Sequence, residues 1–107
     1  MIDWPRVKEL KDEIGPDDFS EVVELFLEEV EEVVGKLRSG DRSQLEQDLH
    51  FLKGSALNLG FEDFSQLCQI GERQSAEGDA QGVDLAEILD KFETSKQRFL
   101  ADLPNLK

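Results

Sequence analysis

The chain has 107 residues with 25 acidic and 12 basic side chains, a net charge of −13, and its length suits one domain spanning residues 1–107. Such a negative field repels phosphate backbones and anionic lipids, which argues against nucleic acid and membrane surfaces as partners. With a single cysteine, no apolar run of bilayer length and no signal-peptide pattern, we expect a cytoplasmic protein.

The first part of the chain predicts a short helix followed by a long one. Asp3 can cap a helix over residues 4–14, which the pair Gly15–Pro16 ends. From residue 17 onward, apolar side chains recur at i, i+3, i+4 and i+7 with glutamates on the opposite face. This second helix is expected to stop at Ser39–Gly40.

Three further helices are expected in the remainder of the chain. Asp41 can cap a third helix that runs to about Gly60, a fourth covers about 62–77, and a fifth covers about 83–103 and ends at Pro104. The sequence has no strand-like alternation of polar and apolar residues. We therefore predict an all-α fold, an antiparallel up-down four-helix bundle with an additional short N-terminal helix.

The third helix carries the only histidine of the chain on its polar side. At about 100° per residue, His50 projects almost opposite the apolar stripe of its helix, which consists of Leu45, Leu49, Leu52, Ala56 and Leu59. Gly54 follows at i+4, where an exposed glycine costs about 1 kcal/mol relative to alanine but leaves a free path to the ring. Lys53 at i+3 reaches the same space and favours negative charge arriving at the ring.

Four other residues surround His50 on the same helix and form a candidate docking patch. Glu46 lies one turn before the histidine, where it favours the protonated ring or is simply one more solvated carboxylate. Leu57, two turns after His50, is an apolar residue on the outward face, and Gln47 lies beside His50 on the surface. Phe51 is on the flank, where it either joins this patch or turns inward.

The chemistry open to one accessible imidazole is narrow. A metal site needs several ligands, and the sequence has no second histidine. Ser55 points away from His50, and Cys68 lies on a core face, so neither is a convincing nucleophile for a hydrolase. A helix face is convex and offers no substrate pocket. Nucleophilic transfer remains, in which an imidazole nitrogen attacks a phosphoryl group brought by another protein.

The run from His50 to Gly60, HFLKGSALNLG, resembles the HxLKGSxxxLG signature of histidine-containing phosphotransfer (HPt) domains, and the resemblance extends from about Asp3 to Leu103. Members of this family are four-helix bundles that relay phosphoryl groups between receiver-domain aspartates in two-component phosphorelays. The resemblance implies that His50 is the phosphoacceptor, that Lys53 balances charge and contacts the partner, and that Gly54 gives access.

The same resemblance assigns a role to one carboxylate on the fourth helix. Glu72 is expected to accept the Nδ1 proton of His50, which fixes the tautomer and leaves Nε2 as the nucleophile. Gly71 departs from the family pattern, since a larger apolar residue is expected there. It either allows close approach of two helices or loosens the fourth helix.

The implied partners are response-regulator receiver domains and a hybrid or sensor histidine kinase. The chain has no glycine-rich phosphate loop, so we expect a carrier without a cofactor or metal of its own, and Mg²⁺ on the partner receiver domain. A monomer is expected, because one bundle can bury the apolar stripes, and a free-standing protein is expected, because the sequence shows no kinase dimerisation, ATP-binding or receiver segment. Two alternatives stay open: a helical interaction module that works without phosphorylation, and the phosphoacceptor module of a chemotaxis-type kinase.

Overall fold

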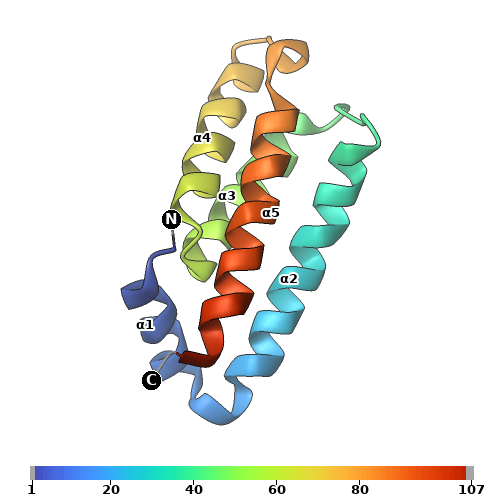
Figure 1. Ribbon diagram of the computed structural model, residues 1–107. Helices are drawn as coiled ribbons and strands as arrows, with labels where there is room; N and C mark the ends of the chain where they lie inside the picture. The colour runs from blue at the N-terminus through green and yellow to red at the C-terminus, as the bar shows by residue number, and fades with distance from the viewer. Residues whose placement is uncertain (1, 106–107) are drawn as a thin grey trace.

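The computed structural model describes residues 2–105, which form a bundle of α-helices elongated along one axis, 43 × 21 × 21 Å (Figure 1). The helices are α1 (Trp4–Ile14), α2 (Pro16–Arg38), α3 (Leu45–Leu59), α4 (Glu62–Ala76) and α5 (Leu85–Asp102), with short 3-10 helices at Ala80–Gly82 and Leu103–Asn105. Helices α2 to α5 run alternately up and down, and α1 lies at one end. The predicted all-α bundle with a short N-terminal helix is therefore confirmed.

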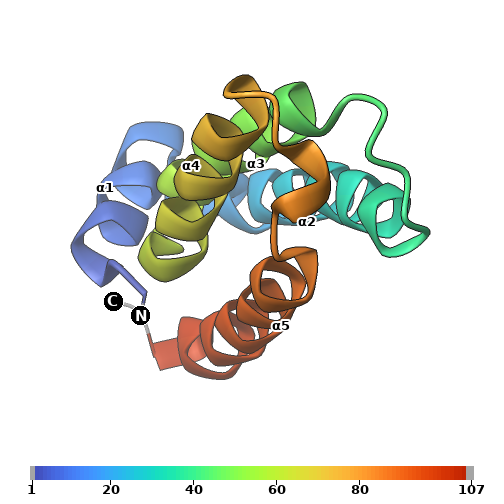
Figure 2. The ribbon, with the colours of Figure 1, turned by 90° about the horizontal axis from the view of Figure 1, so that it is seen from above.

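The four long helices close around one hydrophobic core. Neighbours in sequence pack together, and α2 also contacts α5, so that the ring of helices is complete. In the view from above, α5 lies across the bundle from α3 (Figure 2). Four aromatic rings fill the core at less than 2 % exposure, namely Phe61, Phe64, Phe92 and Phe99. Within residues 2–105, no helix combines the length and apolar composition that crossing a bilayer requires.

Helix α1 is fastened to the turn between α3 and α4. Asp3 caps it as predicted, because its side chain accepts a hydrogen bond from the backbone N–H of Arg6 at 3.2 Å. The backbone N–H of Asp3 donates to the carbonyl of Gly60 at 2.7 Å, and the ring of Trp4 stacks on Phe99 with centroids 5.7 Å apart. Gly60 has φ of +76°, and a Cβ there would lie 2.7 Å from the carbonyl oxygen of Asp3.

The start of the third helix was predicted wrongly. It begins at Leu45 and not at Asp41, because the carboxylate of Asp41 accepts hydrogen bonds from the backbone N–H and the hydroxyl of Ser43. This local turn competes with a helix N-terminus for the same acceptor. Arg42 also lies outside the helix, and its guanidinium donates hydrogen bonds to the carbonyls of Ala80 and Val83. The segment thus links α2 to the loop before α5.

Gly71 is buried where α4 packs against its neighbours. A Cβ at this position would lie 2.8 Å from Leu49 Cδ1 and 3.2 Å from side-chain atoms of Val83 and Ile88. Of the two interpretations offered by the sequence, close approach of helices is therefore correct.

We predict that Gly71→Val lowers the free energy of unfolding by about 1–3 kcal/mol, since it overpacks the contact between α3 and α4. Urea denaturation measures the change. Gly35→Val is the matched control, because Gly35 is also helical and a Cβ there meets nothing within 4 Å. Equal stability of the two variants would contradict this account of Gly71.

Candidate functional site

The histidine lies on the outward face of α3 and contacts a carboxylate of α4. His50 Nδ1 is 2.8 Å from Glu72 Oε2. The imidazole side chain is 69 % exposed, whereas the side chain of Glu72 is 20 % exposed. The ring is thus held from behind by a partly buried acid while its other edge faces solvent.

The register of the α3–α4 hairpin brings these two residues together. His50 lies ten residues before Gly60, and Glu72 lies eleven residues after Phe61, so both are at a similar distance from the turn that joins the helices. Gly71 precedes Glu72 directly and lets α4 approach Leu49, the residue before His50. The close packing of the two backbones therefore lets two side chains of modest length meet.

A lysine completes the cluster. Lys53 Nζ lies 2.8 Å from Glu72 Oε1, so each oxygen of the carboxylate faces a different nitrogen. The hydrogen bond from Lys53 lowers the pKa of Glu72 from its ordinary value of 4.5, with a smaller contribution from His50, and these effects outweigh burial, which acts in the opposite direction. Glu72 is therefore ionised near neutral pH.

The ionised carboxylate determines the tautomer of the histidine. A carboxylate without a proton can only accept hydrogen bonds, so the neutral ring must carry its proton on Nδ1 and donate it to Glu72. Nε2 then has a free lone pair on the opposite edge of the ring. His50 is therefore prepared to act as a nucleophile toward a group that approaches from solvent.

The other residues predicted around His50 all face outward. Gly54 has open space around it, and a Cβ built there would have no atom within 4 Å. Leu57 is 56 % exposed, and Phe51 is 38 % exposed, so Phe51 points outward rather than into the core. Glu46 and Gln47 are also exposed, and the carboxylate that contacts the ring is that of Glu72 and not that of Glu46. Their role in docking stays a prediction.

A shallow groove of about 200 Å³ adjoins the cluster between α3 and α4. Besides Glu46, Lys53 and Glu72, it is lined by Gln69 and Arg73, which the sequence interpretation did not single out. Gln69 lies three residues before Glu72, and Arg73 lies four residues after Gln69, so helical spacing would have indicated them once Glu72 was placed next to His50.

Neither of the two rejected nucleophiles is open to solvent. Ser55 is buried on the inner side of α3. Cys68 is fully buried in the core, where burial raises the pKa of its thiol to about 12 and keeps it protonated. Within residues 2–105, no group of three or more His, Cys, Asp or Glu side chains is arranged to hold a metal ion.

Comparison with known proteins gives one family match. A family model described as the Hpt domain matches residues 21–103, which include α3, α4 and most of α2. Neither curated proteins nor solved structures give a significant match.

We predict that Lys53→Met raises the pKa of Glu72, because the substitution removes the largest cause of the depression and leaves burial less opposed. Since the folded pKa lies below the unfolded one, ionised Glu72 stabilises the fold above about pH 4.5, and this contribution is lost as the pH falls through the folded pKa. Lys53→Met should therefore reduce the contribution of ionised Glu72 to the stability of the fold. Carbon-13 NMR titration of the carboxylates measures the shift.

The matched control is Lys96→Met, which removes an ammonium that pairs with Glu31 on another part of the bundle. This control should leave the titration of Glu72 unchanged. A Glu72 titration that moves equally in both variants, or in neither, would show that Lys53 does not set its pKa.

Proposed function

This chain belongs to the Hpt domain family, and we propose that it accepts a phosphoryl group on His50 from a receiver-domain phosphoaspartate or a kinase and passes it to another receiver aspartate in a two-component phosphorelay. One observation carries the assignment to this residue: the only histidine of the chain is exposed and has its Nδ1 held by a carboxylate. Such a residue meets the needs of a nucleophile that must be reached by another protein.

The proposed transfer needs no proton to move. The lone pair of His50 Nε2 attacks phosphorus in line, a P–N bond forms, and the P–O bond to the donor aspartate breaks with its electron pair leaving on the aspartate carboxylate. Positive charge develops on the ring during the attack, and Glu72 stabilises it across the 2.8 Å contact at Nδ1. The reverse step passes the group to a second receiver.

Lys53 and Gly54 serve this step in different ways. Lys53 balances the charge of Glu72 in the free protein, and its flexible ammonium lies close enough to turn toward an incoming phosphoryl group. Gly54 leaves the space beside the ring empty, so the partner's aspartate can approach. The exposed residues Phe51 and Leu57 contact the partner next to the ring.

The proposed partners are receiver domains and a hybrid or sensor histidine kinase. The chain acts as a carrier, and the divalent metal that organises the phosphoryl group belongs to the receiver. In this scheme, the carrier contributes the nucleophile, its orientation and a docking surface.

We predict that a receiver domain carrying labelled phosphoaspartate transfers label to the unaltered chain and not to the His50→Gln variant. The expected product is acid-labile and base-stable, as a phosphoramidate is. Gel autoradiography after acid and base treatment measures it. Label retained by His50→Gln would overturn the assignment, and full binding and biological activity without any transfer would favour the interaction module.

We also predict opposite effects of Gly54→Ala on stability and on transfer. Alanine raises helix stability by up to about 1 kcal/mol at an open helical position, while its methyl group obstructs the approach to His50 and slows transfer from a receiver. Denaturation and transfer kinetics measure the two effects. Gly35→Ala is the matched control, which gains similar stability in α2 without any change in transfer.

A further inference from the structure

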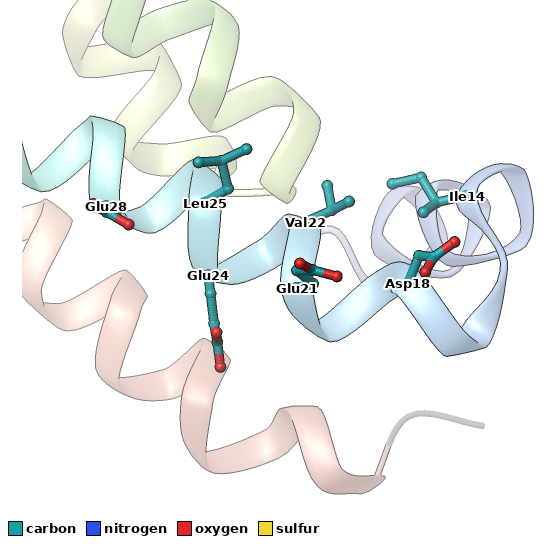
Figure 3. A pocket seen from close by; sticks show the side chains of 7 residues that line it. All are labelled: Ile14, Asp18, Glu21, Val22, Glu24, Leu25 and Glu28. Carbon is teal, nitrogen blue, oxygen red and sulfur yellow. The ribbon is translucent and has the colours of Figure 1, made fainter.

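A second hollow of the surface lies away from the His50–Glu72–Lys53 cluster, where α2 leaves the end of α1 (Figure 3). This groove, of about 520 Å³, has three apolar side chains: Val22 and Leu25 point to the same side of α2, and Ile14 reaches toward them from the end of α1. Four carboxylates line it as well, namely Asp18, Glu21, Glu24 and Glu28. None of its seven described lining residues is basic.

Leu25 lines this groove and is open to solvent. Leu25 is 55 % exposed, although its side chain is large and apolar. Glu21 and Glu28 lie four residues before and three residues after it, so both carboxylates flank Leu25 on the surface of α2. A leucine this exposed contributes little to the hydrophobic core, and another protein can reach it.

The groove faces the same side of the molecule as α3. Leu25 and Lys36 are eleven residues apart, close to three helical turns, and so project in nearly the same direction from α2. Lys36 contacts Asp48 and Gln44 at the start of α3, with distances of 3.0 Å and 3.2 Å. The Leu25 side of α2 is therefore the side next to α3.

Phe51 lies on the matching edge of α3. It is seven residues from both Gln44 and Asn58, which places the three on one side of the helix. Gln44 contacts Lys36 of α2, and Asn58 accepts a hydrogen bond from Arg6 of α1 at 3.0 Å. Phe51 therefore projects from the edge of α3 that carries these contacts to α1 and α2, and it is 38 % exposed.

The distance between the groove and His50 fits one partner. Because α2 and α3 are antiparallel and Lys36 is level with Asp48, Leu25 lies roughly 13 Å from His50 along the bundle axis. A protein that buries about 800 Å² on each side covers a patch about 30 Å across. One docked protein can thus reach the imidazole and the groove together.

We propose that this groove is a docking site for the phosphotransfer partner of His50, which inserts an apolar side chain from a helix that also carries Lys or Arg. The acidic rim selects the partner by charge: it attracts a basic docking helix and repels an acidic one. A second copy of this chain is disfavoured, because it has the same net charge of −13. The identity of this partner rests on the proposed function, whereas the basic apolar character of the docking helix follows from the groove.

The test compares groove variants with matched variants elsewhere, using the receiver domain of the source organism that binds the chain most tightly. Binding is measured on a His50→Gln background, so that the result does not depend on phosphotransfer. Leu25→Ala should weaken binding at least about fivefold. Its control is Ile70→Ala, which truncates a residue of α4 that is 62 % exposed and should leave binding unchanged.

The charge of the rim is tested by the salt dependence of association. The double variant Glu21→Gln/Glu28→Gln should slow association at low salt and flatten its dependence on ionic strength. Its control is Glu77→Gln/Asp90→Asn, which removes the same charge from exposed positions at the end of α4 and in α5. Equal behaviour of the two double variants would overturn selection by charge.

Three further results separate the possibilities. Unchanged affinity in Leu25→Ala would overturn the groove as a docking site, even if His50 is the phosphoacceptor. Self-association of the chain that Leu25→Ala abolishes would put a second copy in the groove and would also overturn the proposal. Labelling with the small phosphodonor phosphoramidate should be equal in groove variants and unaltered chain, while failure of His50 to react with any donor would count against the proposed function alone.

Discussion

One carboxylate holds the candidate site together. Glu72 places one oxygen on His50 Nδ1 and the other near Lys53, each at 2.8 Å, so it fixes both side chains and determines which ring nitrogen keeps its lone pair. This arrangement depends on α4 lying close to α3, and the closeness depends on the missing side chain of Gly71. The absence of a side chain at Gly71 in the core therefore affects the geometry of the cluster at the surface.

The two sides of the imidazole differ in a way that suits a carrier. Behind the ring, Glu72 and Lys53 are 20 % and 25 % exposed and belong to two packed helices. In front of the ring, Gly54 leaves open space, and the imidazole itself is 69 % exposed. A rigid support with an open front allows several proteins to approach one atom in turn, which an enclosed pocket does not.

Helical periodicity accounts for most of what could be predicted from the sequence. It gave the bundle and put His50 and Gly54 on the outward face of α3, since both follow from position within one helix. The contact with Glu72 depends on the register between two helices, so only the family resemblance indicated it. The start of α3 was misplaced because Asp41 has two competing uses. Leu25 was missed because it lies among the glutamates of α2, a face that looked merely solvated.

Helix α1 has a consequence for how such a carrier can diversify. The Hpt family match begins at residue 21, so α1 lies outside it, yet Ile14 from α1 forms one wall of the groove beside α2. The reactive cluster comes entirely from α3 and α4, at the other end of the recognition surface proposed here. If partners dock as proposed, part of the recognition surface therefore lies on a stretch of chain outside the reactive cluster, and changes in the N-terminal segment would alter the choice of partner without touching His50, Lys53 or Glu72.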